Sequence, residues 1–357
     1  MHKNKRKALG LIVEYNPMHN GHRYHLHTAI KKSQAEVVIA AMSPQFVQRG
    51  EPALINKYER TQIALDSGID IVIEIPTFHV LQRADVFAKS AITLLDHLGV
   101  DEIIYGSESN QTQSLVFDKE IMTQGGSFAK ASNQNTLGPN DILGAIYQKI
   151  AQEKNIACHS IQRQGNYHDL ATNKEIISAS AIRHALKTKQ AYEHGLFYKL
   201  DVYDHHFLED YLPYIRYQII QQNEAQLAKH LLMDEGIEHL FKKQRYQQDL
   251  INSCTSKRYT RTRIQRTLLN LYLGIEKKDY PIPTSPRILG LSQKGILYLN
   301  EIKDSHQFSS KFTDYLYHQE ELKFTQLYAQ ILPLDKQKIL EQQEVSFPII
   351  KQAKDRL

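Results

Sequence analysis

The stretch Gly10–His25, GLIVEYNPMHNGHRYH, decides the fold of this chain. Residues Ala8–Val13 form a continuous apolar run with branched side chains, which predicts a buried strand in a parallel sheet. Asn16 is a favoured helix N-cap, and Pro17 suits the first position of a helix. The sequence therefore predicts a strand, a tight loop and a helix start, in that order.

Two histidines, His19 and His22, lie at this expected helix start, with Gly21 between them. A spacing of three places both imidazoles on one face of a helical turn. Gly21 allows a ligand to lie against the backbone, and the amides of a helix N-terminus attract anions. The pattern is typical of a polyphosphate site. Two other interpretations stay open here: ordinary helix residues, or a metal site that lacks a third ligand nearby.

Length and composition limit the class of protein. A chain of 357 residues with 41% hydrophobic residues has room for about two domains with real cores. We find no stretch near the roughly 20 apolar residues that span a bilayer, and Glu14 interrupts the N-terminal apolar run too early for a signal peptide. Cys158 and Cys254 lie far apart and form no metal motif, which indicates reduced thiols in a cytoplasmic protein.

Strands and helices are expected to alternate through the first half of the chain. Further strands are predicted at 36–41, 69–75, 101–105 and 156–163, and helices at 24–34, 57–67, 82–98 and 138–153. This order predicts right-handed crossovers and an α/β fold with a Rossmann-like parallel sheet. Ligands bind such sheets beyond the carboxyl ends of the strands, where the loop Met42–Pro52 with Arg49 and the turn Gly106–Glu108 are expected.

A second helix start with anion-binding character lies at Ile177–Arg183, ISASAIR. Ser178 is a plausible N-cap, Ser180 lies in the first turn, and Arg183 projects from the next turn. Serine hydroxyls, first-turn amides and a guanidinium together suit the β- and γ-phosphates of a nucleotide. An ordinary capped helix remains the alternative interpretation.

The second half of the chain, from Tyr192 onward, is rich in helix-forming stretches, with helices predicted at 212–229 and 320–331. Lys242–Arg266 carries many basic residues and the aromatic residues Tyr246 and Tyr259. Basic side chains grip phosphates and aromatic rings stack on exposed bases, so this segment predicts RNA binding. A solvated helix face is the alternative interpretation. The candidate RNA-binding residues are Lys257, Arg258, Arg261, Arg263 and Arg266.

These motifs together resemble one family. The strings GLIVEYNPMHNGHRYH, FVQRGEPA, YGSE, GPND, YHD, SASAIR and KRYTRTRIQR are similar to those of the bacterial tRNA(Met) cytidine acetate ligases, members of the HxGH nucleotidyltransferase superfamily. The resemblance implies a nucleotidyltransferase-like catalytic domain over residues 1–190 and a mainly helical tRNA-binding domain over 191–357. It also implies a reaction in which ATP and acetate form acetyl-adenylate, and the acetyl group passes to the wobble cytidine of elongator tRNA(Met).

The chemistry of this reaction suggests roles for particular residues, and the resemblance implies the ATP contacts. His19, His22, Ser180 and Arg183 are the expected catalytic residues, and Mg²⁺ is expected to bridge the phosphates without a protein metal cage. Asp169 or Glu14 is the candidate base for acetyl transfer. The expected ATP contacts are Ile12, Val13, Glu14, Tyr15, Asn16, Pro17, Met18, His19, Asn20, Gly21, His22, Arg23, Tyr24, His25, Gly106, Asn140, Arg163 and Gln164.

Two rival functions are compatible with parts of the sequence. The first is an adenylyltransferase that moves AMP onto a small phosphorylated metabolite and never touches RNA; the basic second half argues against it. The second is a non-catalytic RNA-binding protein with a degenerate nucleotide fold. The presence of His19, His22, Ser178, Ser180 and Arg183 argues against that function.

Overall fold

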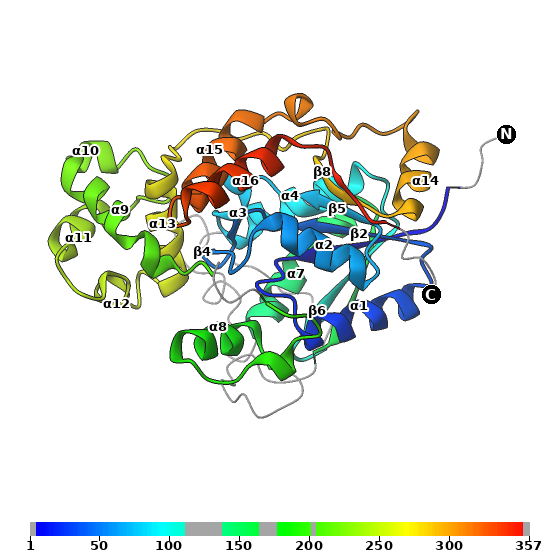
Figure 1. Ribbon diagram of the computed structural model, residues 1–357, viewed down its shortest axis with the longest axis horizontal. Helices are drawn as coiled ribbons and strands as arrows, with labels where there is room; N and C mark the ends of the chain where they lie inside the picture. The colour runs from blue at the N-terminus through cyan, green and yellow to red at the C-terminus, as the bar shows by residue number, and fades with distance from the viewer. Residues whose placement is uncertain (1–4, 111–137, 164–176, 201–204, 353–357) are drawn as a thin grey trace.

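A seven-stranded sheet forms the centre of the computed structural model, which describes residues 5–110, 138–163, 177–200 and 205–352 (Figure 1). The strands, in their order across the sheet, are β7 (Ala157–Gln162), β6 (Glu102–Ser107), β1 (Ala8–Val13), β2 (Val37–Met42), β5 (Ile71–Glu74), β8 (Ile288–Leu291) and β9 (Ile349–Ile350). Neighbours from β7 to β5 are parallel, whereas β8 runs antiparallel to β5. The predicted α/β fold is therefore confirmed, and its parallel sheet gains one antiparallel pair.

Helices of the first half connect these strands. They are α1 (Asn20–Ser33), α2 (Lys57–Ser67), α3 (Thr77–Val80), α4 (Ala84–Asp96), α7 (Pro139–Glu153) and α8 (Ala179–Thr188). The predicted bounds of α2 are confirmed because both of its ends carry clear local signals. Asn56 Oδ1 accepts hydrogen bonds from the Tyr58 and Glu59 amides, and Gly68 ends the helix with a φ of 114°.

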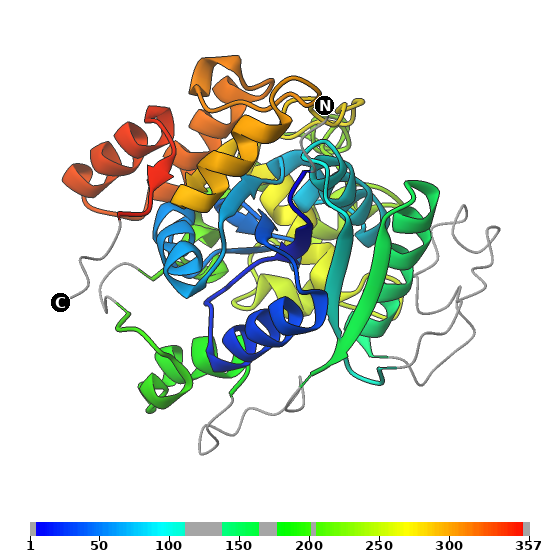
Figure 2. The ribbon, with the colours of Figure 1, turned by 90° about the vertical axis from the view of Figure 1, so that its right-hand side faces the viewer.

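Alternate residues of the central strands face two different cores. In β2, Ile39 and Ala41 pack with side chains of α4, α7 and α14 (Gln293–Ile302). Val38 and Ala40 of the same strand pack with α1 and α2 on the opposite face. Helices therefore cover both faces of the sheet (Figure 2). Burial on both faces explains why these strands are continuous apolar runs and not alternating ones.

The second half of the chain forms a helical region beside the sheet (Figure 1). Its helices are α9 (Leu208–Gln221), α10 (Glu224–Leu227), α11 (Ile237–Gln244), α12 (Leu250–Cys254), α13 (Arg261–Leu273), α15 (His318–Ala329) and α16 (Leu334–Val345), with short 3₁₀ turns at Glu193–Gly195 and Phe312–Asp314. The helix predicted at 212–229 is wrong in its bounds: two helices cover it, and Pro213 lies inside α9. The true start signal is Asp210, whose carboxylate accepts the Phe207 amide at 2.9 Å.

The sheet does not stop at the predicted boundary after residue 190. Strands β8 and β9 come from the second half of the chain and extend the sheet beyond β5. Helix α14, also from the second half, packs its Tyr298 into the core of the sheet. The division into domains at 1–190 and 191–357 stays a prediction, and the sheet draws strands from both sides of it.

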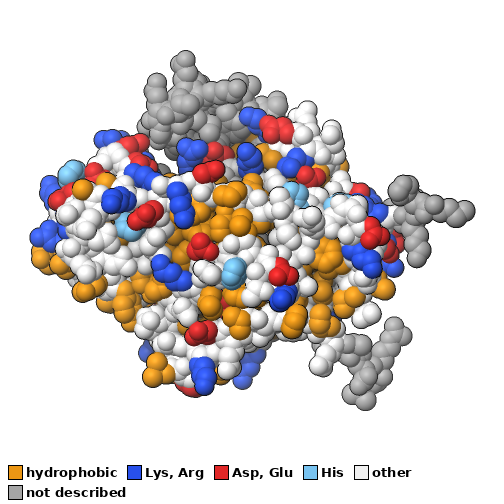
Figure 3. All heavy atoms as spheres, turned by 90° about the horizontal axis from the view of Figure 1, so that it is seen from above, with side chains coloured by type: hydrophobic (Ala, Val, Ile, Leu, Met, Phe, Trp, Pro, Cys, Tyr) orange, Lys and Arg blue, Asp and Glu red, His pale blue; other side chains and the backbone are white. Residues whose placement is uncertain are grey.

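Figure 3 views the molecule from the side of α15 and α16. Exposed large apolar residues from α16 and the residues after it include Leu334, Ile339, Val345 and Phe347. Over the described residues of this face, Lys and Arg are scattered among Asp and Glu and form no continuous basic surface (Figure 3). No helix in the described part of the chain is both long and apolar enough to cross a bilayer.

Candidate functional site

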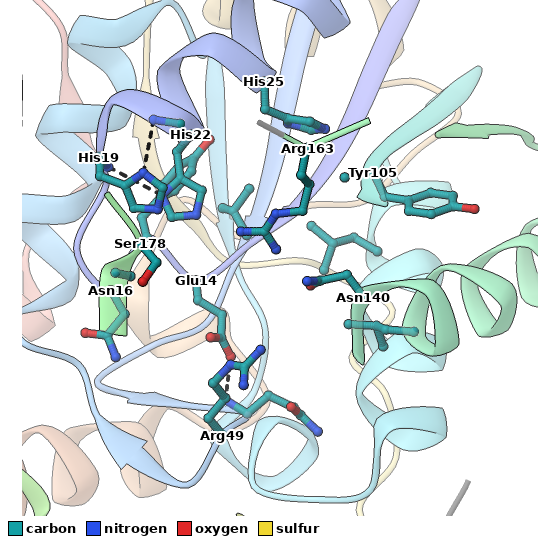
Figure 4. Close-up of a pocket in the computed structure, with 18 of the residues that line it drawn as sticks. Glu14, Asn16, His19, His22, His25, Arg49, Tyr105, Asn140, Arg163 and Ser178 are labelled. Atoms are coloured by element: carbon teal, nitrogen blue, oxygen red, sulfur yellow. Dashed lines mark hydrogen bonds between the residues drawn. The ribbon is translucent and has the colours of Figure 1, made fainter. Parts of the chain in front are cut away.

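A pocket lies beyond the carboxyl ends of β1, β6 and β7, where α1 and α8 begin (Figure 4). This is the edge at which a parallel α/β sheet is expected to bind ligands. Its lining residues are Ile12, Val13, Glu14, Tyr15, Asn16, His19, Gly21, His22, Tyr24, His25, Gln48, Arg49, Phe87, Tyr105, Gly106, Asn140, Leu143, Tyr147, Gln162, Arg163, Ser178, Ala179, Ser180 and Arg183.

His19 is the N-cap of α1, which begins at Asn20. Its Nδ1 accepts the Gly21 amide at 3.0 Å, and His22 Nδ1 accepts the His19 amide at 3.4 Å. The two rings lie 3.8 Å apart between centroids. Because its Nδ1 acts as an acceptor, the neutral His19 ring carries its proton on Nε2, which is buried and has no hydrogen-bond partner within the described residues. His19 can therefore donate to an anion in the pocket, and the His22 ring, which also bonds the Pro17 backbone, lines the same pocket.

The three pocket histidines are neutral near pH 7. Burial lowers the pKa of His19 to about 3 and that of His25 to about 4, and the positive charge of Arg163 acts in the same direction on His19. Burial also lowers the pKa of His22, with His19, Arg163 and His25 adding to the shift. Neutral imidazoles with Nε2–H groups are hydrogen-bond donors, so they suit phosphate oxygens.

The expectation that Asn16 caps the helix is wrong. Its Oδ1 instead accepts the Leu54 amide at 2.7 Å, which ties the β1–α1 loop to the segment after β4 (Glu51–Pro52). Cap preferences show which residue types can cap a helix but not where the helix begins. Here His19, and not Asn16, lies directly before the first helical residue. The helix predicted over 24–34 starts at Asn20, which is earlier than that range but later than a cap at Asn16 would place it.

The expected ATP contacts of this loop separate into two groups. Most line the pocket, but Pro17, Met18, Asn20 and Arg23 do not. Met18 is fully buried, Asn20 donates to the His194 carbonyl at 2.9 Å, and the Arg23 guanidinium lies over the Phe197 ring. Met18 therefore faces the core, and the side chains of Asn20 and Arg23, which lie on α1, contact residues 194 and 197 instead of lining the pocket. Gln164 and the candidate base Asp169 lie outside the described residues.

Gly106 and Arg163 meet where β6 and β7 end. A Cβ on Gly106 would lie 3.1 Å from Arg163 Cγ and 3.7 Å from the His25 ring. The glycine therefore lets these two side chains approach closely in the pocket. Asn140, in the first turn of α7, donates to the Glu108 carboxylate. The predicted positions Gly106, Asn140 and Arg163 are thus brought together with the histidines (Figure 4).

The start of α8 faces the start of α1 across the pocket. Ser178 caps α8 by accepting the Ala181 amide at 3.1 Å, as predicted, and its hydroxyl lies 3.4 Å from that of Ser180. Arg183 also lines the pocket. Its guanidinium donates to the Asn16 carbonyl and pairs with Glu51, each at 2.7 Å. Arg183 therefore connects α8 to the β1–α1 loop and does not depend on a ligand for its position.

Glu14 lies opposite the histidines and points toward Arg49 (Figure 4). Its carboxylate accepts the Gln48 amide at 2.8 Å. Desolvation raises the pKa of Glu14, and the charges of Arg49 and Arg183 oppose that shift only in part. A carboxylate with a raised pKa, held in a pocket beside cations, is a candidate proton acceptor.

Sequence reasoning missed the apolar wall of the pocket. Phe87 of α4 and Leu143 and Tyr147 of α7 line it. On an amphipathic helix such residues are expected in the core, and nothing in their spacing marks the few that also border a cavity. Tyr105, Gln162 and Ala179 were also not expected as lining residues, whereas Gln48 belongs to the Met42–Pro52 loop that was expected at this edge.

The predicted RNA-binding residues have different surroundings. Lys257, Arg258 and Arg261 are exposed. Arg258 and Arg263 pair with Glu235 at 3.3 and 3.2 Å, and Arg261 donates to Asn252. Arg266 differs from all of them, because its guanidinium donates to the Gln48 carbonyl at 3.1 Å, beside the pocket.

Comparison with known proteins identifies the family. The HIGH Nucleotidyl Transferase family matches residues 6–344. The tRNA(Met) cytidine acetate ligase of Leuconostoc mesenteroides is 40% identical, with 83% of this chain and 86% of the relative aligned. The chain belongs to the tRNA(Met) cytidine acetate ligase family. A second member, from Oceanobacillus iheyensis, is 34% identical and aligns with 96% of this chain and 99% of its own.

Solved structures of a tRNA(Met) cytidine acetate ligase family member have the same fold as this chain. Thermotoga maritima TmcAL bound with α-thio ATP superposes with a TM-score of 0.79 at 27% identity, covering 96% of this chain and 99% of its own. The apo form of the same protein gives a TM-score of 0.81 over the same share of both chains. The shared fold extends across both the sheet and the helical region.

Proposed function

We propose that this protein activates acetate with ATP as acetyl-adenylate and transfers the acetyl group to N4 of the wobble cytidine of elongator tRNA(Met). The observation that most strongly supports this proposal is the pair of neutral imidazoles, His19 and His22, at the start of α1. The names of the relatives support the same reaction, and the α-thio ATP complex of T. maritima TmcAL supports ATP as substrate.

In the first step, a carboxylate oxygen of acetate attacks the α-phosphorus of ATP. The bond from that phosphorus to the bridging oxygen breaks, and pyrophosphate leaves with the electron pair. Charge develops on the leaving group, so fixed donors aimed at it lower the barrier. His19 and His22 are proposed to donate from Nε2 to the α- and β-phosphates, and Ser180 with the α8 amides to hold the far end. Arg183 supplies positive charge at the same edge.

In the second step, the N4 amine of cytidine attacks the carbonyl carbon of acetyl-adenylate. The carbon–oxygen bond to AMP breaks, AMP leaves, and the amine loses one proton. Glu14 is proposed to accept that proton, because its raised pKa and its place in the pocket suit a base. A carboxylate whose pKa is raised above its ordinary value accepts a proton more readily than an ordinary carboxylate.

Magnesium is proposed to accompany ATP. No group of three or more His, Cys, Asp or Glu within the described residues can hold a metal ion. The pocket carboxylate Glu14 binds an amide, and Glu51 pairs with Arg183. These residues fit an ion held mainly by phosphate oxygens and water, which is the usual mode for Mg²⁺ with nucleotides. When bound, Mg²⁺ would neutralise charge on the leaving pyrophosphate.

The helical region is proposed to hold the tRNA, with Lys257, Arg258, Arg261 and Arg263 as phosphate contacts. All four lie in or before α13, which packs on β4 (Glu51–Pro52) beside the pocket. A protein that uses ATP and tRNA is expected in the cytoplasm.

Incubation with radiolabelled acetate, ATP and tRNA(Met), followed by digestion to nucleosides, tests the proposal. We expect label in N4-acetylcytidine without added acetyl-CoA, and ATP–pyrophosphate exchange that requires acetate. Transfer of AMP to a small phosphorylated metabolite, with no label in RNA, would instead show the adenylyltransferase function. Nucleotide binding without either reaction would indicate a non-catalytic RNA-binding protein.

A further inference from the structure

The short hairpin of β3 (Phe46–Val47) and β4 connects the pocket with the helical region. Met42–Pro52 was expected to be a plain loop, but it contains this hairpin. Phe46 packs against Tyr211 and Tyr328 in the helical core. The hairpin turn, Gln48–Gly50, lies at the other end, where Gln48 and Arg49 line the pocket. One small element therefore contacts both parts of the molecule.

Helix α13 packs directly against this hairpin turn. Arg266 donates from its guanidinium to the Gln48 carbonyl at 3.1 Å. Gly50 has a φ of +79°, and a Cβ there would lie 2.5 Å from the Arg266 amide nitrogen and 2.8 Å from Gln265 Cβ. The contact is thus too close for any residue other than glycine, and Figure 1 shows β4 beside α13.

The same residue, Gln48, also bonds to a pocket side chain. While the Gln48 carbonyl accepts from Arg266, the Gln48 amide donates to Glu14 at 2.8 Å. The Gly50 amide closes the turn on the Val47 carbonyl at 2.9 Å. Arg266, Gln48 and Glu14 therefore form a continuous hydrogen-bonded chain from α13 to the pocket.

The partial burial of Arg266 favours its contact with the Gln48 carbonyl over a contact with RNA. Desolvation lowers the pKa of Arg266 to about 10, whereas the nearby Glu14 charge acts to raise it. Arg258 and Arg261, by contrast, are exposed and can reach a phosphate. Arg266 is less exposed than these arginines and uses its guanidinium on a backbone carbonyl, so it is less available to a phosphate.

We infer that Arg266 is a positioning residue of the catalytic pocket and not an RNA contact. It holds the hairpin turn so that the Gln48 amide stays on Glu14 and Arg49 stays at the pocket. This inference rests on the proposed function, because it takes the pocket as the site of acetate activation. A small displacement of the turn would move Glu14 and Arg49 away from the positions that acetate activation requires.

The test compares Arg266→Ala and Arg266→Lys with Arg216→Ala as a matched control. Arg216 also donates to backbone carbonyls, those of Arg245, Gln247 and Gln248, but within the helical region. We expect kcat of acetate-dependent ATP–pyrophosphate exchange to fall about 10-fold in both Arg266 variants and to stay normal in Arg216→Ala. Lysine keeps the charge but not the guanidinium geometry, so it should not rescue the exchange.

Two further measurements separate positioning from RNA binding and from simple stability. Binding of tRNA and its salt dependence should match the wild type in both Arg266 variants. Losing the Gln48 hydrogen bond raises the pKa of Glu14 further, so the acid limb of acetyl transfer should move to higher pH in Arg266→Ala. Normal exchange, with weaker tRNA binding and a salt slope reduced by about one, would overturn the inference.

A second variant keeps the test decisive if Arg266→Ala does not fold. Gly50→Ala alters the same contact from the other side without changing any charge. It should reproduce the exchange defect while tRNA affinity is kept; normal exchange in a folded Gly50→Ala protein would overturn the inference. The proposed function is tested separately on the wild-type protein. Exchange that does not require acetate would refute the proposed function, and the variants do not bear on that result.

Discussion

At the scale of single residues, the pocket depends on histidines that do not carry charge. His19 and His22 each accept an amide through Nδ1, within one turn of each other. Burial makes their protonation unfavourable, and the positive charge of Arg163 adds to this effect. The Gly21 amide thereby fixes the tautomer of His19, whose Nε2–H has no hydrogen-bond partner within the described residues and is the donor proposed for ATP. Donors fixed in advance need no reorganisation during the reaction, which is why such sites lower barriers effectively.

The first prediction concerns His22. Changing His22 to Ala should keep the fold and reduce acetate-dependent ATP–pyrophosphate exchange by about 100-fold or more, as for other lost transition-state donors. His27→Ala is the matched control, because His27 lies on the same helix and is exposed. Circular dichroism checks folding, and exchange assays measure the rate. Near-normal exchange by a folded His22→Ala protein would remove the phosphate role of His22.

At the scale of secondary-structure elements, a buried charge cluster joins α16 to the sheet. Glu344 of α16 has no exposed side-chain surface and lies 2.9 Å from Lys57 of α2. Arg287, just before β8, binds both Glu344 and Glu74 of β5. Glu344 also accepts from the Tyr58 hydroxyl at 2.6 Å. The cluster connects helices and strands from both halves of the chain, so it helps to hold the helical region on the sheet.

The second prediction is that Glu344→Gln destabilises the protein strongly. Removing one partner of a buried ion pair typically costs about 3–5 kcal/mol, because Lys57 and Arg287 would then share Glu74 alone. Glu341→Gln, on the exposed face of the same helix, should change stability by less than about 0.5 kcal/mol. Urea unfolding at pH 7 measures both variants. Equal stabilities for the two variants would contradict the cluster's role.

The effect of Glu344 should also depend on pH. Burial alone would raise the pKa of Glu344, but Lys57 and Arg287 outweigh burial and lower it from 4.5 to about 2. A lowered carboxyl pKa stabilises the fold above the unfolded value, and this contribution disappears as the pH falls from about 4.5 to 2. The stability difference between wild type and Glu344→Gln should therefore shrink over that range.

At the scale of the whole molecule, the nucleotide pocket and the basic residues around α13 lie on different parts of one structure. The hairpin of β3 and β4 stands between them, with Phe46 in the helical core and Gln48 at the pocket. In the proposed function, the helical region holds the tRNA and a base of that tRNA reaches the pocket. That proposal assigns acetate activation and RNA binding to different residues, so the two can be measured independently.

The third prediction concerns tRNA affinity. Replacing Arg261 and Arg263 together with Ala should weaken tRNA binding and reduce its salt slope by up to about two, because two phosphate contacts are lost. Arg83→Ala is the control, since Arg83 is an exposed arginine paired with Asp85 at the start of α4, on the sheet. Filter binding at several salt concentrations measures both. If the double variant keeps the wild-type slope, these arginines only bind Glu235 and Asn252.

The sequence by itself determined the elements whose signals are local. The runs Ala8–Val13 and Val37–Met42 are apolar because both faces of the sheet are covered, and helix α2 carries a cap at each end. The motif at His19 and His22 and the cap at Ser178 marked the two helix starts that face the pocket. Such features depend on neighbours within a few residues, so a single sequence contains them.

Tertiary structure alone decided which residues with the same chemistry serve which role. Arg266 and Arg258 look equivalent in a basic run, yet one binds the Gln48 carbonyl and the other is exposed. Strand β8 joins β5 across more than 200 residues, as the pairing of Ile71 with Leu291 shows. Each outcome depends on contacts between segments far apart in the chain, and the local sequence does not contain that information.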